Sequence, residues 1–188
     1  MITLGGYPHY FVGIPISEEI RQVLTEWQKG LSSSVSYKTW THRNDFHITL
    51  KFLGAVADDK IEEVKKKLHD STYPESFAVE AADLSFFGNK QRPRVLFMGV
   101  INPPSLQKMK ENVEQALEEA GFPNENRPYR PHITLAKKWD QEQNERFPIE
   151  QLERYKQSIT FTIDRFHLYR IHPGEAPKYE VIDTVKLR

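Results

Sequence analysis

The chain has 188 residues, of which 26 are basic, 26 are acidic and none is cysteine. This length suits one compact domain, and the lack of cysteine excludes disulfides, thiolate catalysis and cysteine-based zinc sites. The net charge of zero argues against tight, non-specific binding of long nucleic acids, which needs a net basic face. No apolar run is long enough to span a bilayer, and 1–13 lacks the features of a secretory signal. We expect a cytoplasmic monomer that does not bind membranes.

The first half of the chain predicts short strands alternating with amphipathic helices. Residues 10–14 predict a strand, and Ser17 is the expected N-cap of a helix from Glu18 to near Gly30, where apolar residues recur at helical spacing. Residues 38–45 are polar and predict a loop or a strand edge. A strand with a period near two is predicted over 47–53, and a second helix from about Asp58.

The second half repeats this order. Strands are predicted over 77–87 and 95–101, a third helix runs from Pro103 or Pro104 until Gly121, and 128–137 is extended. Residues 140–157 predict a loop with a short helix, and 158–170 and 179–187 predict closing strands. The order indicates an imperfect internal duplication, in which two α+β lobes fold together as a single domain over 1–188.

The tetrapeptide His-Ile-Thr-Leu occurs twice, at 47–50 and 132–135, which are 85 residues apart. For the composition of this chain, such a double occurrence is expected by chance on the order of once in ten thousand sequences. On a strand, residues i and i+2 point to the same face, so each His shares a face with its Thr while Ile and Leu face the core. Two such strands side by side would bring four polar groups into one cleft: His47, Thr49, His132 and Thr134.

Two imidazoles and two hydroxyls suit displacement at a phosphoester. Histidine titrates near neutrality, so a neutral imidazole can take a proton from water while a protonated one gives a proton to the leaving oxygen. The Thr hydroxyls can donate hydrogen bonds to the phosphoryl oxygens. A strained five-membered cyclic phosphate need not require a metal. Two other interpretations stay open: a purely structural His-Thr pair in each strand, and a metal site, although no third ligand sits at a matching offset in both halves.

Residues 46–54, Phe-His-Ile-Thr-Leu-Lys-Phe-Leu-Gly, and 129–135, Tyr-Arg-Pro-His-Ile-Thr-Leu, closely resemble the signatures of the two-histidine (2H) phosphoesterases. They look most like those of the bacterial and archaeal RNA 2',3'-cyclic phosphodiesterases, also called LigT-like or 2'-5' RNA ligase-like proteins. The resemblance covers essentially the whole chain. It implies a bilobal α+β fold, with two pseudo-twofold-related lobes of antiparallel sheet and outer helices around a central cleft. It also implies hydrolysis of RNA or nucleoside 2',3'-cyclic phosphate to a 2'-phosphate without metal or cofactor, with 2'-5' RNA ligation as a further activity.

By this resemblance, His47 is the general acid that releases the 3' oxygen and His132 is the base that activates water, although the pseudo-symmetry allows the roles to swap. Thr49 and Thr134 would bind the phosphate. The family often has an Arg five residues after the second His, where this chain has Lys137, which keeps the charge but loses the bidentate fork. Strict alternation points Lys137 away from the histidine face, so its contribution requires a bulge or a strand end.

The expected partners are RNA ends or nucleotides that carry a 2',3'-cyclic phosphate. Tyr10 and Phe11 are candidates for stacking on a base, and an ordinary core or edge position is the competing interpretation. Two alternative functions remain at this point. One is an RNA-end or nucleotide binding module with little turnover, and the other is a 2H phosphoesterase for another cyclic phosphate.

Overall fold

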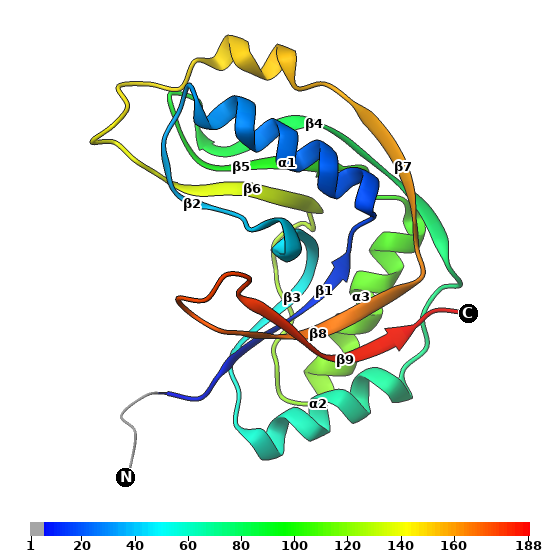
Figure 1. Ribbon diagram of the computed structural model, residues 1–188. Helices are drawn as coiled ribbons and strands as arrows, with labels where there is room; N and C mark the ends of the chain where they lie inside the picture. Colours follow the sequence, from blue (N-terminus) through cyan, green and yellow to red (C-terminus); the bar gives the residue numbers. More distant parts are fainter. Residues whose placement is uncertain (1–5) are drawn as a thin grey trace.

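A sheet of nine antiparallel strands carries the fold of residues 6–188, which this computed structural model describes (Figure 1). The segment 1–13, where the sequence gives no sign of a secretory signal, lies partly outside the described residues. The elements come in this order: β1 (His9–Pro15), α1 (Glu18–Ser32), β2 (Tyr37–Trp40), η1 (Arg43–Asp45), β3 (His47–Ala55), α2 (Asp58–Asp70), β4 (Phe77–Asn89), β5 (Arg92–Val100), α3 (Pro104–Glu119), β6 (His132–Trp139), η2 (Ile149–Arg154), β7 (Ser158–Ile163), β8 (Arg165–Ile171) and β9 (Tyr179–Lys186).

The strand order divides the sheet into two lobes. Strands β3-β1-β8-β9 form what we call the first lobe, and β7-β4-β5-β6, with β2 beside β6, form the second lobe. The two motif strands, β3 and β6, are central and join the lobes through the antiparallel pair Ile48 and Ile133. The predicted α+β fold with two sheet lobes is confirmed.

The helices are exchanged between the lobes. Helix α1 follows β1 of the first lobe but lies across the second, whereas α3 follows β5 of the second lobe and packs against α2 and β3 of the first (Figure 1). On α1, the Trp27 ring lies 5.7 Å from that of Tyr155, which follows η2, and Gln28 hydrogen-bonds β6. Each lobe is thus packed against a helix that follows a strand of the other lobe.

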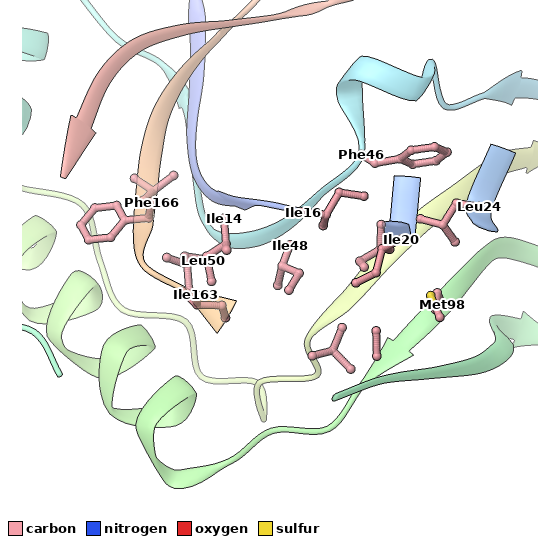
Figure 2. Packing of buried hydrophobic residues seen from close by; sticks show 14 of the residues in the cluster. Ile14, Ile16, Ile20, Leu24, Phe46, Ile48, Leu50, Met98, Ile163 and Phe166 are labelled. Carbon is pink, nitrogen blue, oxygen red and sulfur yellow. The ribbon is translucent and has the colours of Figure 1, made fainter. Parts of the chain in front are cut away.

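Local sequence explains where α1 begins and which face it buries. The Ser17 hydroxyl accepts the Ile20 N–H at 3.3 Å, which confirms the predicted N-cap. Helical spacing then places Ile20, Leu24 and further apolar side chains on the buried face. Figure 2 shows Ile48 between the group around Leu50 and Phe166 and the group around Ile20 and Leu24, in one continuous core.

One expectation about the strands needs revision. The segment 158–170 is two strands, because the chain leaves the second lobe after β7 and enters the first at β8, with Asp164 between them. The sequence pattern alone does not reveal this change of lobe, because buried residues alternate with less buried ones in both β7 and β8. The segment 38–45, expected as a loop or a strand edge, begins in the edge strand β2, which pairs with β6, and continues into the short helix η1.

Candidate active site

The two motif strands present their polar residues as alternation predicts. Ile48, Leu50, Ile133 and Leu135 are buried, with exposed fractions of 1% or less. His47, Thr49, His132 and Thr134 are half-buried on the opposite face of the sheet. Because β3 and β6 pair at Ile48 and Ile133, this face brings both motifs to the junction of the lobes.

Each imidazole is oriented by a backbone carbonyl two residues before it. Nδ1 of His47 lies 2.7 Å from the Asp45 oxygen, and Nδ1 of His132 lies 2.7 Å from the Arg130 oxygen. A carbonyl only accepts hydrogen bonds, so Nδ1 must carry the proton in both rings. The neutral rings therefore have their lone pair at Nε2. In His47, Nε2 lies 2.9 Å from the Thr49 hydroxyl.

Aromatic side chains support the two imidazoles. The His47 ring centroid lies 4.6 Å from that of Phe11 and 5.3 Å from that of Tyr179. Asp45, which is buried, accepts the N–H groups of Lys178 and Tyr179 at 2.8 and 3.2 Å, and so holds the start of β9 beside the first motif. The aromatic support fixes the orientation of the ring and removes water from around it.

The second imidazole has a different aromatic support. The His132 ring centroid lies 4.9 Å from that of Phe87 on β4 and 5.2 Å from that of Phe97 on β5. Both histidines therefore lie against rings from strands other than their own, although the supporting residues of the two lobes differ in sequence.

Burial makes both histidines less basic than a free imidazole. Burial and, to a smaller extent, the positive charges of His132 and Lys137 together lower the pKa of His47 from 6.5 to about 4, against the opposing effect of Asp45. The pKa of His132 is also lowered, by burial and by the charge of Arg130. Both rings are then neutral at pH 7 in the free protein. A bound phosphate anion would stabilise the protonated form of either ring.

A β-bulge follows the Thr in each motif and brings one further residue to the site. In the pairing of β3 with β1, Leu50 has no partner, and in the pairing of β6 with β5, Leu135 has none. Each bulge reverses the alternation after the motif. The residues five positions after the histidines, Phe52 and Lys137, consequently lie on the same face as the motifs. The bulge that the contribution of Lys137 requires is present.

Polar side chains from the two exchanged helices hold the carbonyls of the bulge residues. Lys110 on α3 donates to the Leu50 oxygen at 2.6 Å, and Gln28 on α1 donates to the Leu135 oxygen at 2.9 Å. Lys110 also donates to Glu114, which in turn pairs with Lys51 at 2.6 Å. Although burial alone would raise it, hydrogen bonds from both lysines hold the pKa of Glu114 below its usual value.

A cavity of about 270 Å³ lies at the first motif and reaches the second; its lining includes His47, Thr49, Thr134, Lys137 and Phe52 but not His132. Phe52 is 54% exposed, which is unusual for a large aromatic side chain. A second cavity of about 230 Å³ adjoins the first through Thr41, Lys137 and Tyr179 and adds Lys38 and Lys178. Burial and the charges of Lys178 and Lys138 lower the pKa of Lys137.

The structure decides between the two interpretations of Tyr10 and Phe11. Tyr10 and Phe11 are each 3% exposed, so neither ring is open to a base; Phe11 instead supports His47.

Phe52 was not predicted from the sequence, because strict alternation places it on the face opposite to His47 and only the bulge reverses this. The sequence could have indicated Phe52 through its position, because it follows His47 by five residues, just as Lys137 follows His132 in the other motif.

The described part of the chain contains no set of ligands for the metal site that the sequence left open. Within residues 6–188, no three or more His, Cys, Asp or Glu side chains are grouped so that they could hold a metal ion. Over the same residues, no helix has the length and apolar character needed to cross a membrane.

Two central strands that each carry His-x-Thr and pair with one another at Ile48 and Ile133 define the class of the 2H phosphoesterases. Comparison with known sequences gives the family: the profile of the 2'-5' RNA ligase superfamily matches residues 16–175, and the chain belongs to that family. It is 35% identical over 183 residues to the RNA 2',3'-cyclic phosphodiesterase of Bacillus subtilis (strain 168), covering 96% of this chain and 97% of the relative. It is 31% identical to the protein of that name from Thermotoga maritima, covering 85% and 84% of the two chains.

Solved structures show the same fold. The crystal structure of Escherichia coli LigT complexed with 3'-AMP has a TM-score of 0.76 to this chain at 20% identity, and the match covers 96% of this chain and 98% of the other. A phosphodiesterase domain, MHV ns2, has a TM-score of 0.58 at 14% identity. At these identities the likeness concerns the fold.

Proposed function

We propose that this protein hydrolyses RNA or nucleoside 2',3'-cyclic phosphates to 2'-phosphates without a metal, with His47 and His132 as the acid–base pair. The observation that carries the proposal is the matched orientation of the two imidazoles. Both hold Nδ1–H on a backbone carbonyl, so both offer Nε2 for proton transfer at the junction of the lobes. The names of the relatives from Bacillus subtilis and Thermotoga maritima agree with this activity.

The threonines bind the phosphoryl group in this proposal. In the free protein, the Thr49 hydroxyl is within hydrogen-bonding distance of Nε2 of His47. A bound phosphate takes this hydroxyl as a donor to a non-bridging oxygen and frees Nε2 for the leaving oxygen, and Thr134 donates from the other strand. The negative charge of the phosphate raises the pKa of the nearer imidazole, so the acid becomes protonated when the substrate binds.

The position of Phe52 supports the assignment of the acid. The Phe52 ring is exposed in the same cavity as His47, where a nucleobase can stack on it. A nucleoside bound there has its ribose, and hence the leaving 3' oxygen, next to His47. His132 then takes the proton from the attacking water on the opposite side of phosphorus, because attack and departure are roughly in line. Lys137 supplies positive charge to the phosphate from the cavity wall.

The surroundings of the site extend the proposal. Lys38 and Lys178 line the adjoining cavity, where they favour an anionic ligand such as an RNA end. We further propose that the protein acts in the cytoplasm as a monomer and that 1–188 forms one domain. The exchange of α1 and α3 between the lobes supports the single domain.

The test is to incubate the protein with 2',3'-cyclic AMP, and separately with an RNA that ends in a cyclic phosphate, in the presence of EDTA. Phosphorus NMR should show a 2'-phosphate in both cases. His47→Ala and His132→Ala should each abolish turnover and keep the fold, whereas His172→Ala, which changes a surface histidine paired with Glu180, should be active.

Absence of product with both substrates would refute the proposed activity and leave a binding module. If activity occurs only without EDTA, the reaction uses a metal. An active His132→Ala variant would contradict the shared site.

A further inference from the structure

The two motif strands share little backbone pairing with each other. Among residues 6–188, β3 and β6 are paired at Ile48 and Ile133 alone, whereas each pairs over most of its length with a strand of its own lobe. A side-chain contact adds to this single pair: the Tyr129 hydroxyl donates to the Thr49 carbonyl oxygen at 2.9 Å. The contact joins the segment just before the second motif to the backbone of the first.

The segment that leads into His132 is irregular, so contacts outside helices and strands must fix its course. Residues 120–131 form neither helix nor strand, and most of them are exposed. Tyr129, near the end of this segment, is half-buried, and its ring packs against the core. The ammonium group of Lys110 lies 5.3 Å from the centre of that ring. Tyr129 is therefore a fixed point at the end of a loop.

Each residue between this fixed point and His132 has a contact of its own. The Arg130 carbonyl accepts the Nδ1–H of His132 at 2.7 Å. Pro131 is buried, its ring restricts φ, and its carbonyl accepts the Val100 N–H at 3.2 Å. The chain from Tyr129 to the imidazole is short and stiff. A displacement of Tyr129 is consequently passed to the carbonyl that orients the ring.

The first histidine is oriented without such a contact between the motifs. The carbonyl that holds His47 belongs to Asp45, the last residue of η1. The buried Asp45 carboxylate is held in turn by the N–H groups of Lys178 and Tyr179. Because an acid and a base act on opposite sides of one phosphorus atom, their relative position affects the rate steeply. The contact that ties the second imidazole to the first motif is thus placed where it matters for catalysis.

We propose that Tyr129 is the positioning residue that sets His132 relative to the first motif, through the hydrogen bond from its hydroxyl to the Thr49 carbonyl. This assignment rests on the proposed function of the two histidines. Tyr129 acts through its neighbours and takes no part in proton transfer. Without its hydroxyl, the Arg130 carbonyl moves and Nδ1–H loses a fixed acceptor. The ring then also populates the other tautomer, in which Nε2 carries the proton and cannot accept one from water.

Tyr129→Phe tests this assignment, because it removes the hydroxyl and keeps the ring. With 2',3'-cyclic AMP as the substrate, kcat should fall about tenfold and KM should change less than about twofold, since a small displacement of a reacting group slows the reaction more than it weakens binding. The second measurement is proton–nitrogen NMR of the neutral His132 ring without substrate, with His132→Ala to assign the signals. The wild type should carry the proton on Nδ1, and Tyr129→Phe should show both tautomers.

Tyr73→Phe is the matched control. The Tyr73 hydroxyl also donates to a carbonyl from a half-buried position, that of Leu68 at 2.8 Å, but it does so at the end of α2. Both variants lose one hydrogen bond of the same kind, so urea unfolding should show a similar loss of stability in each. Turnover and the single tautomer should be lost in Tyr129→Phe and kept in Tyr73→Phe.

A wild-type kcat or an unchanged tautomer in Tyr129→Phe would show that Tyr129 has a structural role alone and would overturn the assignment. A rise in KM at constant kcat would also overturn it. Should Tyr129→Phe not fold, Pro131→Ala decides: it keeps the hydroxyl but loosens the chain between Tyr129 and the ring, and wild-type kcat with a single tautomer in this variant refutes the assignment. No 2'-AMP from the wild type refutes the proposed function itself, which the tautomer measurement does not require.

Discussion

Lys110 on α3 donates a 2.6 Å hydrogen bond to the Leu50 carbonyl, which belongs to the unpaired residue of the bulge in β3. Gln28 on α1 makes the matching contact with the Leu135 carbonyl of the bulge in β6. A carbonyl left unpaired in the core costs free energy, so a bulge at a buried residue needs a donor from elsewhere. Helix α3 supplies that donor to Leu50, and α1 supplies a second donor to Leu135 beside the Thr41 N–H. The bulges in turn place Phe52 and Lys137 in the site.

Lys110→Met should destabilise the protein by about 2–3 kcal/mol, because it leaves the Leu50 carbonyl without its donor and removes one of the two lysines that pair with Glu114, which keeps Lys51. Urea unfolding monitored by circular dichroism measures the change. Lys108→Met, at an exposed position on the same helix, is the matched control and should be within about 0.5 kcal/mol of the wild type. Equal stability of the two variants would contradict the role of Lys110.

Gln28→Met should act on the other bulge with a smaller effect on stability. The Leu135 carbonyl keeps the Thr41 N–H at 2.9 Å, so the loss is about 1 kcal/mol. Because Lys137 comes after this bulge, KM for the cyclic phosphate should rise severalfold with a smaller change in kcat. Gln22→Met, on the exposed side of α1, serves as the control. A Gln28→Met variant that loses stability without any change in KM would show that Gln28 does not position Lys137.

The sequence was sufficient to predict the parts of the site that depend on alternation. His47, Thr49, His132 and Thr134 share a face because period-two patterns need no tertiary information. The orientation of the residues after each bulge could not be predicted, because Leu50 and Leu135 are ordinary strand residues, and only the pairing with β1 and β5 shows that each is an extra residue. The exchange of helices was equally hidden, since amphipathic periodicity shows which face of a helix is buried but not against which lobe.

Gly13→Ala should reduce turnover by displacing His47. An added Cβ would lie 3.1 Å from the Phe11 ring, 3.2 Å from the Ile48 oxygen and 3.3 Å from Cδ2 of His47. The imidazole must then move by a few tenths of an ångström, and we expect kcat to fall about tenfold with little change in KM. Gly6→Ala, where nothing lies within 4 Å of the added atom, is the control. Unchanged kcat in Gly13→Ala would mean that the position of the ring tolerates this shift.

The pH dependence should reflect the buried histidines. Because the pKa of His47 is about 4 and that of His132 is also lowered from 6.5, both are neutral at pH 7, whereas the reaction needs one protonated ring. The optimum of kcat/KM, which reports the free enzyme, should lie below pH 6.5. Lys137→Gln removes a positive charge that disfavours protonated His47, so the His47 pKa should rise. Proton NMR titration measures this pKa, and Lys138→Gln should leave it unchanged. A downward shift in Lys137→Gln would contradict the proximity of the two charges.

Phe52→Ala should weaken binding of the nucleoside while sparing the chemistry. The Phe52 ring is 54% exposed in the same cavity as His47, and stacking of a base on an aromatic side chain contributes about 1–3 kcal/mol. KM for 2',3'-cyclic AMP should therefore rise about tenfold or more, with kcat changed less, and Phe52→Trp should restore the wild-type KM. Val181→Ala, at an exposed apolar position on β9, controls for the general loss of surface apolar area. A fall in kcat at constant KM would instead place Phe52 among the residues that orient His47, and the nucleoside would then have to bind elsewhere in the cleft.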